Sequence, residues 1–309
     1  MRRLREDNGQ AVVFIVVVFI GLMAIIALAV DVGSWYTQKR RLQGTADAAV
    51  LAGAQDLPDT TTAATTAHTY ANLNNSGLNS WSPAFPDTTT IKVQLSKPAP
   101  AFFAKALGIS SVTIHAKASA TVGVPGSIRF ALPVGVRESV VCSASSTGCF
   151  DTPKTLTFDD TSTTSFDSST WGLLDLAGSS NASSTCTGKA SASDQSGWVG
   201  SGYNGLLAVN RYYGATTGER TQIRTALNAR VGQVLLVPVF DTSDLSWCNT
   251  GGFRVIGWAA WVIDNTIPNS DWNPHLKTLH GHFTEYIAED VDSTPGVPGF
   301  GVKVIKLTD

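Results

Sequence analysis

The chain has 309 residues, of which 43% are hydrophobic and only 15% are charged. Its 22 lysine and arginine residues are offset by 24 acidic residues, which leaves a formal net charge of −2 at pH 7. A protein that binds nucleic acid needs a basic surface to neutralise the phosphate backbone, so this balance argues against nucleic acid as a partner.

The first predicted element is a transmembrane helix at residues 11–30. These 20 residues are uncharged, and fourteen of them are Val, Ile, Leu or Phe. A helix of this length rises about 30 Å, which matches the hydrocarbon core of a bilayer. The apolar side chains favour insertion by about 4 to 8 kcal/mol. We therefore expect a single-pass membrane protein whose residues 1–10 form a short cytoplasmic tail.

A secretory signal peptide is the alternative, because arginines precede the apolar run and Ala27-Leu28-Ala29 resembles a cleavage site. The run is longer than the usual signal-peptide core of about 7 to 15 residues, which favours a retained anchor. Basic residues flank the run at Arg2, Arg3, Arg5, Lys39, Arg40 and Arg41. Charge alone therefore leaves the orientation open, whereas the Ser, Thr and Gly content and four cysteines predict an extracytoplasmic C-terminal part.

Beyond the bilayer, the same helix is expected to continue as a packing helix. A seam of residues at alternating steps of three and four, broken by Lys39, consists of Val32, Trp35, Leu42, Ala46, Ala49 and Gly53. The small residues of this seam let a neighbouring backbone approach closely. That neighbour is either the chain's own globular part or a partner helix, which would give a homo- or hetero-oligomer through the anchor helix.

A small α+β unit is predicted next, so that residues 31–125 comprise the stalk helix and this unit. Alanines and a tyrosine at helical spacing predict a helix at 59–75, with Asp59 as its N-cap. Strict alternation of apolar and polar residues predicts strands at 91–96 and 112–122.

A short helix is expected between these two strands, at residues 100–107. Gly108 is placed to end it. We expect this helix to bury Phe102, Phe103 and Leu107.

A turn signal at residues 124–126 opens a second domain, residues 126–309. Short strands separated by Gly, Ser, Asn and Pro are predicted at 128–136, 155–158, 234–240, 253–263, 280–288 and 302–307. One helix is predicted at 219–230. The fold class is therefore α+β: a single transmembrane helix that extends into a packing helix, a small α+β unit, and a mostly antiparallel β domain with one helix.

Four cysteines lie in the second domain, at Cys142, Cys149, Cys186 and Cys248. None forms a C-x-x-C pair of the kind used by metal sites, so disulfides are expected. The preferred pairing joins Cys142 to Cys149 and Cys186 to Cys248, and free thiols are the alternative.

Catalytic motifs are absent: the sequence contains no G-x-S-x-G, P-loop or H-E-x-x-H. His280 and His282 share one face of a predicted strand and could hold a metal, although such a pair is more often a solvated strand face. Tryptophans could line a carbohydrate-binding face or fill a core, namely Trp171, Trp198, Trp247, Trp258, Trp261 and Trp272. We expect no catalytic residue, no cofactor and no metal, and hence a protein that is not an enzyme.

Residues 9–54 resemble the N-terminal segment of the TadE/TadG-like family of Flp (tight-adherence) pilus-assembly proteins, most closely its TadG members. The matching features are a Gly-Gln before the apolar run, Asp31-Val32-Gly33 after it, Tyr36, the basic Lys39-Arg40-Arg41, and an alanine-rich end from Ala46 to Ala54. The resemblance implies a single-pass membrane protein that works beside a pilus or secretion machine. Processed pilin-like members have a glutamate five residues after the cleaved glycine, where this chain has Phe14, so the resemblance implies an uncleaved anchor.

The expected function is thus a membrane-anchored, non-enzymatic component of a Flp/Tad-type pilus-assembly or secretion system. Its expected location is the cell membrane, and its expected partners are the membrane and other pilus-assembly proteins, with an extracytoplasmic docking domain exposed to them. The alternative is an exported carbohydrate-binding or hydrolytic domain tethered by the same anchor.

Overall fold

The computed structural model describes residues 10–143, 148–159, 169–180, 190–216, 221–241, 252–272, 276–289 and 291–308. The chain divides into two compact units, each of which is described by itself. Unit 1 comprises residues 1–122 and 305–309, and unit 2 comprises residues 123–304. The end of the chain therefore returns to unit 1, a long-range connection that the sequence pattern does not contain.

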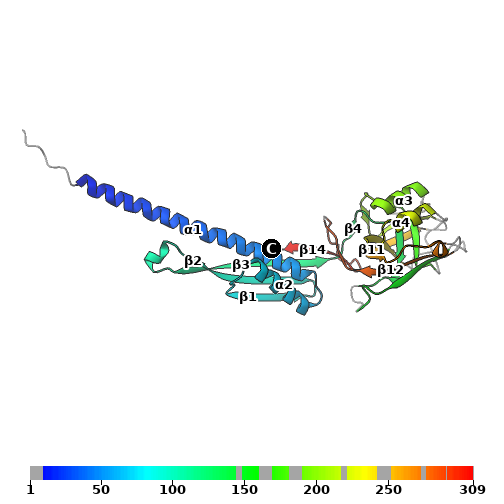
Figure 1. Ribbon diagram of the computed structural model, residues 1–309, viewed down its shortest axis with the longest axis horizontal. Coiled ribbons are helices and arrows are strands. Elements are labelled where there is room, and N and C mark those ends of the chain that lie inside the picture. Colours follow the sequence, from blue (N-terminus) through cyan, green and yellow to red (C-terminus); the bar gives the residue numbers. More distant parts are fainter. Residues whose placement is uncertain are drawn as a thin grey trace, which may run out of the picture. The chain divides into compact units, whose positions relative to one another are not determined.

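The dominant element of unit 1 is α1, a single unbroken helix from Gln10–Ala54 (Figure 1). It is followed by α2 (Thr60–Asn74), which begins where the Asp59 side chain accepts hydrogen bonds from the backbone N–H groups of Thr61 and Thr62. Those bonds satisfy two of the amides that a helix start leaves unpaired, as the sequence predicted for Asp59. The C-terminal half of α1 packs against α2.

A sheet completes unit 1. Its strands are β1 (Ser80–Asp87), β2 (Thr90–Pro100), β3 (Ser111–Gly123) and the end of β14 (Val302–Thr308), in the order β1-β2-β3-β14. β1, β2 and β3 are antiparallel neighbours, and a short 3₁₀ helix, η1 (Ala104–Leu107), lies in the connection from β2 to β3. β1 contains two prolines, which fits its place at the sheet edge because proline cannot donate to a strand ladder.

The core of unit 1 lies between the two helices and one face of this sheet. Its buried members come from both helices, the turn between them, β2 and β3: Leu42, Ala46, Ala49, Val50, Ala54, Leu57, Ala63, Ala67, Ala71, Ile91, Val93, Leu95, Ala99, Ile114, Ala116 and Ala120. Alternate residues of β2, such as Lys92 and Gln94, are exposed on the opposite face. Unit 1 is thus a two-layer α+β unit in which the helix leaving the apolar run is itself part of the core.

Unit 2 is built on a seven-stranded sheet in the order β10-β5-β7-β9-β11-β12-β6, with a further pairing of β10 to β11. The strands are β5 (Val134–Arg137), β6 (Lys154–Asp159), β7 (Trp171–Ser180), β9 (Arg211–Thr216), β10 (Val234–Phe240), β11 (Gly252–Ile263) and β12 (Leu276–Thr284). The β10–β11 pairing closes five strands into a circuit, so this part is a small barrel. All pairings in the circuit are antiparallel except β10 with β5.

Smaller elements complete unit 2. Two short strand pairs are formed by β4 (Ser127–Ile128) with β8 (Leu207–Ala208), and by β13 (Tyr286–Ile287) with the start of β14. Two α-helices are described, α3 (Ala192–Ser201) and α4 (Thr221–Asn228), together with the short 3₁₀ helices η2 (Glu138–Val140) and η5 (Asn269–Asp271). The mostly antiparallel β domain agrees with the sequence prediction, whereas α3 was not predicted.

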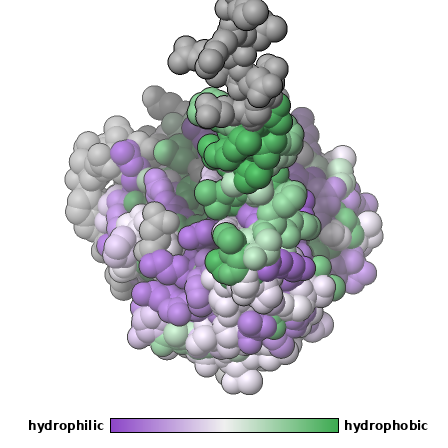
Figure 2. Space-filling model, turned by 90° about the vertical axis from the view of Figure 1, so that its left-hand side faces the viewer, coloured by the Kyte–Doolittle hydropathy of each residue, from purple (hydrophilic) through white to green (hydrophobic). Residues whose placement is uncertain are grey.

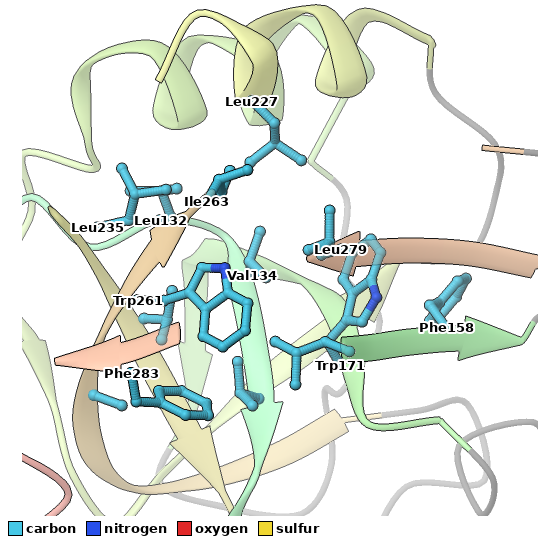
Figure 3. Close-up of a cluster of buried hydrophobic side chains, with 14 of the residues drawn as sticks. Leu132, Val134, Phe158, Trp171, Leu227, Leu235, Trp261, Ile263, Leu279 and Phe283 are labelled. Atoms are coloured by element: carbon cyan, nitrogen blue, oxygen red, sulfur yellow. The ribbon is translucent and has the colours of Figure 1, made fainter. Parts of the chain in front are cut away.

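Large aromatic side chains fill the interior of unit 2. Figure 3 shows Leu227 reaching from α4 toward Ile263 of β11, and Trp261 packed near Phe283. The rings of Trp261 and Phe283 meet edge to face with centroids 4.7 Å apart, a favoured geometry for aromatic pairs. Trp171 is fully buried and its indole N–H donates to the Lys277 backbone oxygen at 3.3 Å.

A disulfide joins Cys142 to Cys149, which is the first of the two pairings preferred from the sequence. Cys142 is fully buried in the core of unit 2 and Cys149 packs against that core. Cys186 and Cys248 lie outside the described residues, so the second pairing stays a prediction.

Replacing Cys142 and Cys149 together by serine is expected to lower the free energy of unfolding of unit 2 by about 2 to 3 kcal/mol, because the unfolded chain regains the entropy that the short loop removes. Denaturant unfolding of the full chain in detergent, with and without reductant, measures this change. Thiol counting on the denatured, non-reduced protein should find at most two reactive cysteines, and four would refute the disulfide.

Candidate functional site

The N-terminal half of α1 is an exposed apolar rod. Its large hydrophobic side chains from Val12 to Val30 are each 45% to 71% exposed. Figure 2 shows this green surface projecting toward the viewer. Within the described residues, one helix is long and apolar enough to cross a membrane, and it is this one. So much exposed apolar surface is unfavourable in water, so this segment requires an apolar environment.

The rod ends at Asp31, where polarity changes abruptly. Asp31 is only 1% exposed, and its carboxylate accepts hydrogen bonds from the backbone N–H groups of Phe102, Phe103 and Ala104 at 2.6 to 3.3 Å. Burial by itself raises the pKa of Asp31, but these three N–H groups and the nearby positive charge of Lys105 outweigh it and hold the pKa below its ordinary value. The first residue after the apolar rod thereby fixes the connection between β2 and β3.

The hydrogen bonds at Asp31 predict a pH dependence. Because folding lowers the pKa of this carboxyl, its contribution to stability is present above the unfolded value, about 3.9, and is lost as the pH falls through the folded value. Hydrogen exchange of the amides of residues 102–104, corrected for intrinsic rates, should show protection that falls below about pH 4. In the Asp31→Asn variant this pH dependence should vanish; its persistence would contradict the assignment.

Two further side chains of α1 join it to the β2–β3 hairpin. The Trp35 indole N–H donates to the Pro100 backbone oxygen at 3.1 Å. The Gln43 side-chain amide donates to the Lys117 backbone oxygen at 2.8 Å. These contacts hold the hairpin along α1 from the end of the apolar rod onward.

The predicted packing seam lies partly inside unit 1. Leu42, Ala46 and Ala49 are fully buried among α2, β2 and β3, and Trp35 packs against the edge of the same core. Val32 differs, because it is 50% exposed.

Gly53 of the seam shows how closely α1 approaches α2. A Cβ built on this glycine would lie 2.6 Å from the Ala63 backbone oxygen and 2.7 Å from the Ala67 Cβ. The seam therefore contacts the chain's own α2 and sheet over this stretch, and among its members Val32 remains available to a partner helix.

A polar groove of about 440 Å³ begins two residues beyond Asp31. Its lining comes from α1, the end of α2 and β2, and consists of Gly33, Ser34, Thr37, Gln38, Arg41, Asn75 and Lys97. Lys97 donates to Asn75 and to the Ser76 backbone oxygen. Apart from Gly33, the residues that line the groove have polar or charged side chains, in contrast to the apolar rod on the other side of Asp31.

The two histidines on β12 each have a carboxylate partner. His280 Nε2 lies 3.2 Å from Asp271 Oδ2, and His282 Nδ1 lies 2.7 Å from Asp264 Oδ1. The histidines thus engage different acidic residues. Among the described residues, no group of three or more His, Cys, Asp or Glu side chains is arranged to hold a metal ion.

The tryptophans do not form an exposed binding face in the described part of the chain. Trp171, Trp258, Trp261 and Trp272 are 0% to 5% exposed, and Trp198 is partly buried against the Tyr203 ring. Trp247 lies outside the described residues. These indoles serve as core side chains, and a stacking surface for a sugar would need them exposed.

The structure corrects one sequence expectation near Asp31. Phe102, Phe103 and Leu107 were expected to be buried, but they are 60%, 54% and 82% exposed. η1 does form and ends at Gly108, whose φ of +84° is the left-handed conformation that glycine adopts most readily. The connection between two antiparallel strands is a hairpin end, and its side chains project beyond the sheet. That topology, which the two predicted strands already implied, could have shown that these residues are exposed.

A protein-family model matches the N-terminal part of the chain. Residues 9–56 match the model of the family described as "Putative Flp pilus-assembly TadE/G-like" (Tad). No curated protein and no solved structure matches the chain. The match covers the part of the chain that forms α1, and it does not separate TadG members from TadE members.

Proposed function

We propose that this chain is a membrane-anchored, non-enzymatic component of a Flp/Tad-type pilus-assembly or secretion system, with unit 2 as its extracytoplasmic docking domain. The observation that supports this most directly is the correspondence between the family match at residues 9–56 and a single unbroken helix. One half of that helix is an exposed apolar rod and the other half is part of a folded core.

Because α1 is one continuous helix, it both anchors the chain and supports unit 1. Because its C-terminal half is buried among α2 and the sheet, unit 1 is joined to the membrane segment by a helix and not by a flexible linker. Rigid attachment holds unit 1 at a defined height above the bilayer, which suits a protein that positions other components beside a membrane machine.

We place both units outside the cytoplasm, with residues 1–10 inside and residues 11–30 as a retained single span. The Cys142–Cys149 disulfide supports export, because disulfides persist in oxidising compartments. Phe14 stands where processed pilin-like members have glutamate, which supports an uncleaved, TadG-like anchor. Other pilus-assembly proteins are the proposed partners, and the exposed apolar rod, together with Val32 just beyond it, provides a surface for an oligomer through the anchor helix.

The test is genetic. Deleting the gene in the native host should abolish pilus production and surface attachment, and the full chain supplied in trans should restore both. A chain whose residues 1–30 are replaced by a cleaved signal peptide should be exported but should not restore them. The Gly44→Ala chain is the matched control, because a Cβ at this exposed helical glycine meets nothing within 4 Å. If the deletion leaves pilus production unchanged, the proposed function is wrong.

A further inference from the structure

The tip of the β2–β3 hairpin, defined here as residues 101–110, presents a dense group of exposed apolar side chains. Phe102, Phe103, Leu107 and Ile109 are 60%, 54%, 82% and 44% exposed. Within the tip the single charged side chain is Lys105, which is also exposed. Scattered exposed apolar residues are ordinary on protein surfaces, but a contiguous group marks a contact surface.

The tip lies at the level where the apolar rod ends. Its backbone N–H groups at Phe102, Phe103 and Ala104 are bonded to the Asp31 carboxylate, so these atoms are within 3.3 Å of it. Asp31 directly follows the 20 uncharged residues whose helix would rise about 30 Å across the hydrocarbon core. If residues 11–30 span the bilayer, the tip is therefore at the membrane surface.

The hairpin is held in this position by more than Asp31. Trp35, one helical turn further along α1, is bonded to Pro100 at the end of β2. Figure 1 shows the end of the β2–β3 hairpin beside the middle of α1, with the apolar half of the helix continuing past it. The tip thus cannot swing away from the rod without breaking both contacts.

We propose that this tip inserts into the surface of the lipid bilayer beside α1, as a second membrane contact. Phe102, Phe103, Leu107 and Ile109 enter the acyl chains near the headgroups, and Lys105 extends to a lipid phosphate. The tip is bonded to Asp31, where the exposed apolar rod ends, so its exposed apolar side chains lie at the depth of that end of the rod, which is the reason for choosing lipid over a protein partner. This inference rests on the proposed membrane anchoring, and it adds that unit 1 is held in one orientation on the bilayer.

Lipid crosslinking tests this. The full chain is reconstituted into vesicles of equal parts phosphatidylethanolamine and phosphatidylglycerol, with p-benzoylphenylalanine in place of Leu107, Leu73 or Ile20. Leu73 on α2 is the matched control, because it is 77% exposed and lies outside the tip. The probe at Ile20 reports whether the anchor itself contacts lipid. After irradiation, intact mass spectrometry measures the yield of lipid adducts.

The proposal predicts a lipid-adduct yield at Leu107 on the order of tenfold above that at Leu73 and close to that at Ile20, because crosslinking requires direct contact. If the probe at Ile20 gives lipid adducts but the yield at Leu107 is no higher than that at Leu73, the tip proposal is wrong and the anchor is unaffected. A chain-to-chain adduct at Leu107 in place of the lipid adduct would also overturn it, in favour of a second copy. No adduct at Ile20 would instead refute the anchor on which the proposal rests.

Discussion

Gly53→Ala is expected to lower the free energy of unfolding of unit 1 by about 1 to 3 kcal/mol, although alanine is the better helix former. The reason is steric. The added methyl group would lie 2.6 Å from the Ala63 backbone oxygen, 2.7 Å from the Ala67 Cβ and 2.9 Å from the Ile91 Cδ1. Two of these atoms belong to α2 and cannot move without shifting that helix.

Gly44→Ala is the matched comparison, because it makes the same change in the same helix. Nothing lies within 4 Å of a Cβ at this exposed position. The helix-propensity benefit, about 0.5 to 1 kcal/mol, should therefore appear there as added stability. The difference between the two variants isolates the close packing of the seam from any general effect of replacing glycine.

Hydrogen exchange of the full chain in detergent measures both variants, with amides of α2 and β2 reporting the opening of unit 1. Protection should fall for Gly53→Ala and rise slightly for Gly44→Ala. Equal effects at the two positions would show that α1 does not pack against α2 as described.

The second large effect is expected in unit 2, where Trp171→Ala should lower the free energy of unfolding by about 3 to 5 kcal/mol. Trp171 is fully buried, and its ring centroid lies 5.3 Å from that of Phe158 and 6.0 Å from that of Trp272. Removing it leaves a cavity between these rings and leaves the Lys277 backbone oxygen without the indole donor.

Trp198→Ala is the control. Because this tryptophan is only partly buried, its replacement should lower the free energy of unfolding clearly less than Trp171→Ala does. Trp171→Phe should recover part of the loss by refilling the cavity. Denaturant unfolding followed through the amides of β6 and β10 measures the three variants. If Trp171→Ala and Trp198→Ala had equal effects, Trp171 would not be the core residue described.

The sequence predicted the elements whose patterns are strong. The uncharged run, the alternation in β2 and β3, and the apolar strands β10 and β11 are strong local patterns. β3, β10 and β11 appear within one residue of their predicted bounds, whereas β2 continues beyond the predicted 91–96 to Pro100. The Asp59 cap was predictable because a carboxylate before a helix has a specific local role.

The elements that were missed depend on distant partners. α3 contains three serines and two glycines, which are poor helix formers, and it is held by burying Val199 and Gln195 and by a capping box between Ser191 and Asp194. β1 contains two prolines, yet it forms an edge strand that pairs with β2. The return of residues 305–309 to unit 1 is a long-range pairing that no local pattern indicates.

At the candidate site, too, the features with a local sequence pattern were predictable and the contacts between distant residues were not. The apolar rod was visible as an uncharged run and the seam as a periodic pattern, and Leu42, Ala46 and Ala49 of the seam are buried in the core of unit 1. The bonds from Asp31 to the hairpin tip were not predictable, because they join residues more than 70 positions apart. The prediction that the tip is buried is wrong, because apolar character alone does not imply burial.

Residues 11–30 are proposed to remain attached and to hold the folded chain on the membrane. Intact mass spectrometry of the protein extracted from carbonate-washed membranes of the native host shows whether they do. We expect a species whose mass still includes residues 11–30. A species that begins at Val30, recovered in the soluble fraction, would contradict it.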